Sequence, residues 1–266
     1  MSITFSTCFY ILKSKFDKDT YISWMNNLIS IVNKFNLVIY TDQNSIQYIN
    51  SHNNPNIKII IKPLNQFYTY KYKDLWIKNH QNNSLLNNHI IWEVNMLWNE
   101  KISFVNETAT NKYFNTPYYG WCDIGYFRNR SNDLNTSHLQ HWAHKSKINN
   151  LSSSKIHYAL INNNQNQLNY LNHIISNKNS LSLPSQPIPP DQISIAGGFF
   201  ITHISQLDWW FNTFYNKLHL YLNNNYLVKD DQLIIIDCIF SNFDHFFLHQ
   251  EHSKYDNWFM FQRILQ

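Results

Sequence analysis

Glycine and charged residues are scarce in this chain, and several common phosphate-binding and catalytic motifs are absent from it. Only 4 of the 266 residues are glycine, and charged residues make up 14% of the chain. The GxGxxG pattern, the P-loop, HExxH and GxSxG are all absent. These absences argue against a nucleotidyltransferase, a metal-dependent hydrolase and a Ser-His-Asp hydrolase.

Cysteine and long apolar runs are scarce as well. The three cysteines, Cys8, Cys122 and Cys238, lie far apart and form no CxxC pair, which argues against a disulfide scaffold or a cysteine zinc site and favours a reducing compartment. No apolar run approaches the roughly 18 residues of a membrane span, and residues 1–12 lack the basic start of a signal peptide. We therefore expect a soluble, cytoplasmic protein with no membrane span.

The charge balance narrows the possible partners. The net charge of +4 is small, and no run of Lys or Arg is long enough for a nucleic-acid tail. We expect no nucleic-acid partner and only a weak preference for anionic ligands. The abundance of Asn, Lys, Ile and Tyr is typical of an AT-rich viral or bacterial genome and says little about function.

Apolar runs alternate with amphipathic segments through the first half of the chain. Short apolar, β-branched runs predict strands, and apolar residues at helical spacing predict helices. The predicted strands are 3–9, 36–41, 57–62 and 118–123, and the predicted helices are 17–33, 43–50 and most of 85–115. This alternation predicts an α/β fold with a central, mostly parallel sheet flanked by helices. No domain boundary is visible, so we predict one domain over 1–266.

The second half of the chain is less regular. Expected elements are a helix at 137–145, strands at 156–161, 192–203 and 245–249, a helical stripe from Leu207 to Tyr221, and a helix that opens on Asp230 and Asp231. The segment 162–191 is rich in Asn and Ser and ends with four prolines. That composition predicts a flexible loop or lid that contributes little to the core.

An acid, a glycine and a base follow the fourth predicted strand. In open α/β sheets, ligands bind outside the carboxyl ends of the strands, so Asp123 is in position to hold a metal or a ribose. Gly125 would let a ligand approach the backbone, and Arg128 could meet a phosphate. A turn capped by Asp123, in which Gly125 supplies a positive φ, explains the same pattern. Both interpretations stay open.

Two further polar clusters interrupt apolar segments. Gly197 and Gly198 break a predicted strand, which indicates either a bulge or the close approach of a sugar or of another stretch of backbone. Asp230, Asp231 and Gln232 open a helix, where acids stabilise the helix dipole and cap its end. With Gln232 beside them, the same acids could hold several hydroxyl groups.

A histidine and a lysine near the end of the chain are weaker candidates. His249 follows a short strand, and Lys254 comes soon after it. Because the chain has thirteen histidines, a single one is more often structural than a ligand. A histidine beside a strand-end acid could still complete a metal site with oxygen and nitrogen ligands.

The order of these elements resembles the WlaTC/HtrL/YibB family of glycosyltransferases. The matching stretches, which span almost the whole chain, are FSTCFY, LWNEKISFV, YGWCDIGYFR, IAGGFF, VKDDQLII and HFFLHQEHSKYDNWFMFQR. WCDIGYFR is the most specific of them. The resemblance implies a GT-A-type fold and a nucleotide-sugar donor, most often a UDP-sugar.

The resemblance also implies roles for individual residues. Asp123 would stand where GT-A enzymes place the first acid of the DxD motif, which binds a divalent metal, usually Mn²⁺, and His249 would be the second metal ligand. Gly125 occupies the position of the second acid. Asp231 would contact the transferred sugar or act as the base, and Gln232 would position the reacting face.

The donor would be held from several segments. Gly197 and Gly198 would leave space for the transferred sugar, and the diphosphate charge would be shared among Lys101, Arg128 and Lys254. From the geometry of open sheets, we also expect the ends of the first two strands to touch the nucleotide. The residues concerned are Thr7, Cys8, Phe9, Tyr40 and Asp42.

Two functions of different classes follow. The first is transfer of a hexose-type sugar from a nucleotide-sugar to a glycan or glycoconjugate acceptor. The alternative is a catalytically inactive protein that binds a nucleotide-sugar or a glycan. The high aromatic content, 17%, suits sugar stacking in both, although aromatic residues are usually part of the core.

Overall fold

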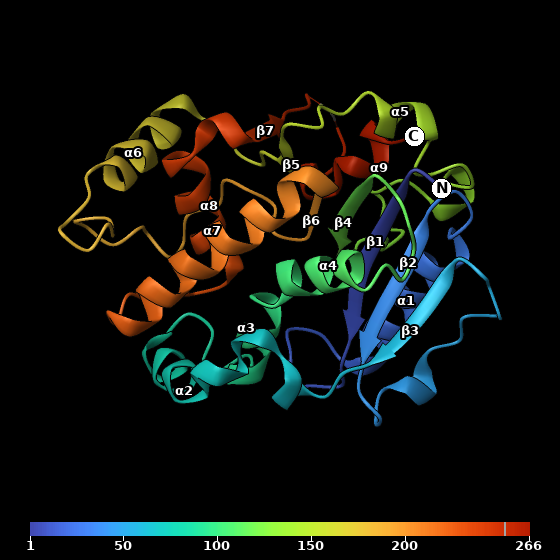
Figure 1. The fold of residues 1–266 in the computed structure, drawn as a ribbon, viewed down its shortest axis with the longest axis horizontal. Coiled ribbons are helices and arrows are strands. Elements are labelled where there is room, and N and C mark those ends of the chain that lie inside the picture. Colours follow the sequence, from blue (N-terminus) through green and yellow to red (C-terminus); the bar gives the residue numbers. More distant parts are fainter. Residues whose placement is uncertain (253) are drawn as a thin grey trace.

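A computed structural model describes residues 1–252 and 254–266, and this part of the chain forms a seven-stranded sheet between two layers of helices (Figure 1). The strand order is β3-β2-β1-β4-β6-β5-β7. The strands are β1 (Ile3–Phe9), β2 (Asn36–Thr41), β3 (Ile57–Ile61), β4 (Tyr118–Cys122), β5 (Ile156–Ala159), β6 (Phe199–His203) and β7 (Phe246–His249).

The sheet is mostly parallel. β1 pairs in parallel with β2 and β4, and β2 pairs in parallel with β3. Only β6 is reversed, because it runs antiparallel to both of its neighbours, β4 and β5, while β5 and β7 are again parallel to each other. The predicted α/β class with a mostly parallel central sheet is therefore confirmed, and it is compatible with a Rossmann-like fold.

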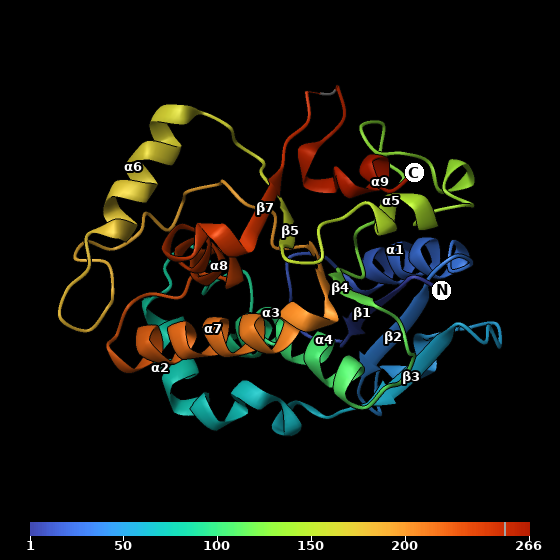
Figure 2. The same cartoon turned by 45° about the horizontal axis from the view of Figure 1, so that its top comes forward.

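Helices cover both faces of this sheet, as Figure 2 shows. One face is packed by α4, α7 and α8, and the other by α1, α5 and α9. The helices are α1 (Lys18–Ser30), α2 (Lys73–Asn82), α3 (Trp92–Trp98), α4 (Lys101–Thr110), α5 (Lys145–Asn149), α6 (Gln165–Ser176), α7 (Ile204–Asn223), α8 (Asp231–Ser241) and α9 (Phe261–Ile264). Among the described residues, none of these helices has the length and apolarity to cross a membrane.

The core has two halves because side chains alternate across the central strands. In β2, Val38 and Tyr40 point to the α4 face, whereas Leu37 and Ile39 point to the α1 face. Every residue of β1, β2 and β4 is buried, as expected for strands covered on both sides. The apolar runs in the sequence therefore report double-sided burial.

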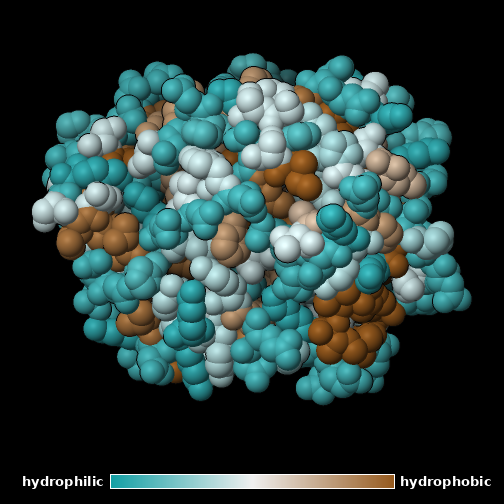
Figure 3. Space-filling view, in the orientation of Figure 1, coloured by the Kyte–Doolittle hydropathy of each residue, from teal (hydrophilic) through white to brown (hydrophobic). Residues whose placement is uncertain are grey.

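The surface is polar although charged residues are few. Figure 3 shows a mostly hydrophilic face on which hydrophobic residues form separate patches. Polar side chains also cap the ends of helices. The Oδ1 of Asp17 accepts from Thr20 N at 2.8 Å and caps α1, and Asn164 caps α6 through its side chain.

The segment 162–191 was expected to be a loop with little core, and that expectation is wrong. It contains α6, and it buries apolar residues in the larger half of the core. These residues are Leu171, Ile174, Ile175, Leu183 and Ile188. The spacing 171, 174, 175 is a helical stripe, but a composition dominated by Asn and Ser concealed it.

Smaller differences concern element boundaries and short helices. The expected helix at 137–145 is a 3-10 turn at Thr136–His138, and α5 begins only at Lys145. The expected helix at 43–50 is reduced to a 3-10 turn at Ile46–Tyr48, the predicted strand 192–203 begins only at Phe199, and α2 was not anticipated. The strand that ends at 203 is shortened because Gly197 and Gly198, just before Phe199, pass close to two carboxylates of the site described below.

A buried carboxylate joins α7, α8 and the segment that follows α6. The fully buried Asp237 accepts hydrogen bonds from Tyr221 Oη at 2.7 Å and Ser241 Oγ at 2.8 Å, and it forms ion pairs with Lys178 at 2.6 Å and Lys217 at 3.2 Å. Four partners compensate the cost of burying this charge. Removal of the Asp237 carboxylate would leave Lys178 and Lys217 without the anion that pairs with both of them.

We predict that Asp237→Ala lowers the free energy of unfolding by roughly 3–5 kcal/mol, the usual cost of breaking a buried ion pair from one side. Urea unfolding followed by circular dichroism measures this loss. Asp208→Ala, on the exposed side of α7, is the matched control and should change stability by no more than about 0.5 kcal/mol. A loss below about 1 kcal/mol in Asp237→Ala would contradict the structural role assigned to this network.

Candidate functional site

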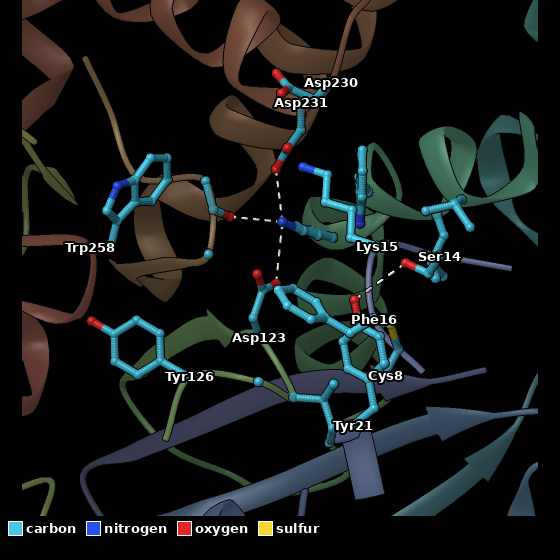
Figure 4. Close-up of a pocket in the computed structure, with 18 of the residues that line it drawn as sticks. Cys8, Ser14, Lys15, Phe16, Tyr21, Asp123, Tyr126, Asp230, Asp231 and Trp258 are labelled. Atoms are coloured by element: carbon cyan, nitrogen blue, oxygen red, sulfur yellow. Dashed lines mark hydrogen bonds and ion pairs between the residues drawn. The ribbon is translucent and has the colours of Figure 1, made fainter. Parts of the chain in front are cut away.

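A cavity of about 580 Å³ opens where the carboxyl ends of β1 and β4 meet the start of α8 (Figure 4). Its volume lies within the range of about 300–1,000 Å³ that is usual for small-molecule sites. The segments that line it are the end of β1 and the loop after it, α3, the turn after β4, the approach to β6, the starts of α4 and α8, and the stretch 256–259. These segments are far apart in the sequence, so the cavity exists only in the folded chain.

A buried lysine ammonium joins four of these segments. Lys101, the first residue of α4, donates from Nζ to the carbonyl oxygen of Gly197 at 2.9 Å. The same nitrogen lies 3.2 Å from Asp123 Oδ1 and 3.0 Å from Asp231 Oδ2, and Figure 4 marks these contacts with dashed lines. The three donors of the ammonium thus face three acceptors, although the lysine side chain is only 9% exposed.

Burial and charge act on this cluster in opposite directions. Burial alone would lower the pKa of the Lys101 ammonium, but Asp123 and Asp231 more than offset it, so the pKa lies above its ordinary value. For Asp231 burial prevails, and it raises the pKa from 3.8 to about 6 in spite of the neighbouring ammonium. The cluster therefore holds a permanent cation beside an acid that can gain a proton near pH 6.

The glycine pair makes room for the two carboxylates. A Cβ atom at Gly197 would lie 2.8 Å from Asp231 Oδ2, and a Cβ atom at Gly198 would lie 3.0 Å from Asp123 Oδ2. The chain entering β6 therefore passes between the two acids without side chains. This close approach, to protein groups, is the reason for the interruption of the predicted strand.

Gly125 is required by packing. A Cβ atom there would lie 2.6 Å from Cε3 of Trp24, whose ring covers this position. None of the glycines in the described chain has a positive φ, so the interpretation of Gly125 as a turn residue with positive φ is wrong. The side chain is missing because the α1 tryptophan occupies its place.

Arg128 is held beside the same tryptophan. Its Nε donates to the carbonyl oxygen of Gly125 at 2.8 Å. Its guanidinium carbon lies 4.3 Å from the centre of the Trp24 ring and 5.1 Å from that of Phe259. These aromatic faces and the backbone bond fix the guanidinium at the rim of the cavity.

Most of the predicted site residues line this one cavity. Those that do are Cys8, Phe9, Lys101, Asp123, Gly125, Arg128, Gly197, Gly198, Asp231 and Gln232. Those that do not are Thr7, Tyr40, Asp42, His249 and Lys254. The strand-end geometry of β1 and β4 thus placed residues correctly at the cavity, whereas the end of β2 lies outside it.

The residues at the end of β2 serve the fold. The Tyr40 hydroxyl donates to the carbonyl oxygen of Phe104 at 3.1 Å, under α4. The Oδ1 of Asp42 accepts from Ser45 N at 2.7 Å and caps a turn. Thr7, on the neighbouring strand β1, is fully buried. The local sequence patterns did not indicate that α4 packs over this part of the sheet.

His249 lies in a different environment from the one expected. Nε2 of His157 is 3.0 Å from the carbonyl oxygen of Ser152 and must donate to it, so Nδ1 of His157 accepts from His249 Nε2 at 3.1 Å. Burial, together with His157, lowers the pKa of His249 to about 4. The two rings form a neutral hydrogen-bonded pair between β5 and β7. Lys254 lies over the ring of Tyr255.

The residues present do not form the expected metal site. Asp123 and His249 do not meet at the cavity, and no group of three His, Cys, Asp or Glu within the described residues is arranged to hold a metal ion. The Oδ1 of Asp123 already accepts from Trp121 Nε1 and faces Lys101. A dication at Asp123 would therefore lie close to a fixed ammonium.

Several cavity residues were not predicted from the sequence. They include Lys15, Phe16, Tyr21, Lys229 and Trp258. Lys15 and Phe16 lie on the loop before α1 and Tyr21 lies near the start of α1, where no motif stands out. A single signal was available in the aromatic residues 16, 21 and 24, which form edge-to-face contacts around the start of α1.

Comparison of this sequence with models of known protein families gave no match, and comparison with curated proteins gave none at significant similarity.

The first prediction for the site concerns pH. Between pH 3.8 and about 6 the folded protein holds a proton on Asp231 that the unfolded chain has released, so stability falls as pH rises through this window. Asp231→Asn cannot titrate and should escape this loss. The wild-type free energy of unfolding, relative to the variant, should therefore fall by roughly 1–3 kcal/mol across the window. Urea titrations of both proteins at several pH values measure it, and parallel curves would contradict the assigned pKa.

The second prediction concerns Gly125. The Cβ atom of Gly125→Ala would displace Trp24, and such overpacking usually costs about 1–3 kcal/mol of stability. The same substitution in a Trp24→Ala background should cost less than half as much, because the obstructing ring is gone. A double-mutant cycle by urea unfolding measures both values. Equal costs in the two backgrounds would show that Trp24 is not the constraint.

Proposed function

We propose that this protein is a glycosyltransferase of the GT-A type that moves a hexose-type sugar from a nucleotide-sugar to a glycan or glycoconjugate. A UDP-sugar is the donor that we propose first. The proposal extends the resemblance to the WlaTC/HtrL/YibB family. The observation that carries it is the cavity itself. It lies at the carboxyl ends of β1 and β4 and gathers the strand-end Asp123, the glycine pair and the acids of α8 around one buried ammonium.

The position of the cavity suits a nucleotide-sugar. Open α/β sheets bind such ligands outside the carboxyl ends of their strands, and Cys8 and Phe9 form that end of β1. Phe16, Tyr21 and Trp258 add aromatic faces on which a base or a sugar ring can stack. Anionic, aromatic and hydroxyl-bearing parts of one ligand would each find a matching group.

The charges in the cavity suit the proposed chemistry. Departure of a nucleoside diphosphate from an oxocarbenium-like centre develops negative charge on the leaving group, which nearby fixed cations stabilise. Arg128 at the rim is such a cation, and Lys101 holds Asp123 and Asp231 in place. Asp231, with a pKa of about 6, is suited to proton transfer near neutral pH, and Gln232 beside it can hold a hydroxyl group.

A thermal-shift panel of nucleotide-sugars, with and without Mn²⁺, is the first test, followed by a transfer assay with the donor that stabilises the protein. Binding without transfer to any acceptor would favour the alternative, an inactive protein that binds nucleotide-sugars or glycans. Failure of every nucleotide-sugar to stabilise the protein would refute the proposed donor class.

The residue-level prediction is that Asp123→Asn lowers transfer by roughly a hundredfold, the scale seen when one electrostatic group aimed at the transition state is removed. Asp19→Asn is the matched control because Asp19 lies exposed on α1 and does not line the cavity. Circular dichroism establishes that both variants fold. Unchanged transfer by a folded Asp123→Asn would remove the support that this acid gives to the proposal.

A further inference from the structure

We infer that this protein binds the diphosphate of its ligand through two side-chain cations, Arg128 and Lys15, without a resident divalent metal. The inference rests on the proposed function for the identity of the ligand as a nucleoside diphosphate. The geometry that carries it, an anion-binding rim on the cavity, is independent of the sugar, the acceptor and the transfer step.

The first observation is the pairing of the cavity cations. Lys101 is paired with Asp123 and Asp231, and Lys229 lies 3.1 Å from Asp230 Oδ2. Arg130 is paired with Asp133 and with Asp256 at 3.1 Å each. In the chain as described, residues 1–252 and 254–266, Arg128 and Lys15 are the cavity cations that form no ion pair. A ligand with two negative groups would satisfy both.

The second observation is how Arg128 is prepared for this role. Its Nε donates to the Gly125 carbonyl oxygen, and its guanidinium lies close to the rings of Trp24 and Phe259. Its terminal nitrogens make no hydrogen bond to the described residues, and Arg128 lines the cavity. A guanidinium fixed in this way presents a two-pronged donor that matches phosphate oxygens and loses little side-chain entropy on binding.

Lys15 approaches from a different segment. It lies on the loop between β1 and α1, and its Nζ is 4.7 Å from the centre of the Trp98 ring. Figure 4 shows Lys15 on the same cavity as Asp123 and Asp231. Lys15 therefore brings a second cation, which lies over an aromatic ring, to the lining of the same cavity from a separate segment.

The third observation is that the chain excludes a second acid where a metal site would need one. At position 125 even a Cβ atom would collide with Trp24, so no carboxylate fits there in this packing. Asp123 shares its Oδ1 with the Lys101 ammonium and Trp121, and His249 is bonded to His157 away from the cavity. The same tryptophan that closes position 125 also supports Arg128. One tryptophan thus both fills the space beside position 125 and supports the arginine.

Calorimetric titration of the whole chain tests this inference with two kinds of probe, inorganic pyrophosphate and the nucleotides UDP, GDP and CDP. Each probe is titrated after treatment with EDTA and again with added Mn²⁺. We expect binding without metal, with an affinity within about threefold of that measured with Mn²⁺, since charge-assisted hydrogen bonds supply the contact. Binding that occurs only with Mn²⁺ would overturn the inference.

Substitutions assign the contact. Arg128→Met and Lys15→Met should each weaken the binding of pyrophosphate and of the best nucleotide by roughly tenfold or more, the scale of one lost charge-assisted contact. Lys13→Met is the matched control because Lys13 is exposed two residues away and does not line the cavity. Arg128→Lys keeps the charge and should recover part of the loss. Wild-type affinity in both methionine variants would overturn the inference.

The two probes separate this inference from the proposed function. Metal-free binding of pyrophosphate that depends on Arg128 and Lys15, with no binding of any nucleotide, would support the anion-binding rim and contradict the nucleotide-sugar donor. Binding of neither probe under any condition would overturn the rim. Nucleotide binding that needs Mn²⁺ would be consistent with the proposed function, but it would overturn this inference and indicate that a metal binds at the site.

Discussion

The Lys101 ammonium is the charge around which this site is organised. Left unpaired in the interior, such an ion would cost several kcal/mol, which is the order of the penalty for taking a charge out of water. Asp123, Asp231 and the Gly197 carbonyl oxygen compensate it, and they come from β4, α8 and the approach to β6. The cation thus ties together four segments that lie far apart in the sequence, and the cavity forms beside it.

Several residue choices follow from this one requirement. The acids can reach the ammonium only if the chain between them has no side chains, and this accounts for Gly197 and Gly198. Asp231 is buried by the same closure, so its pKa rises toward neutrality. The inner part of the cavity is charged but internally paired, whereas Arg128 and Lys15 form no ion pair with the residues that the structure describes. In the proposed complex the anionic part of the ligand contacts these two cations and its neutral part extends toward the acids.

The protein departs from the metal-binding arrangement that the family resemblance implied, and it does so through packing. Trp24 fills the position above Gly125 that a second acid would need, and Arg128 stacks on that tryptophan. His249 is committed to His157 across neighbouring strands. The proposed diphosphate site would use side-chain cations in place of the metal that this arrangement would hold.

The sequence by itself determined the features that depend on near neighbours. Short apolar, β-branched runs located the strands, Asp17 and Asp230 marked helix starts through their own capping bonds, and the strand-end rule brought Asp123 to the cavity. Partners distant in sequence decided the rest. Tyr40 is a core residue because α4 covers it. His249 is kept from the cavity by its hydrogen bond to His157, and position 125 must be glycine because Trp24 lies against it. Such contacts join residues tens of positions apart, so a local pattern carries no record of them, and only the packed tertiary structure selects which polar groups remain available to a ligand.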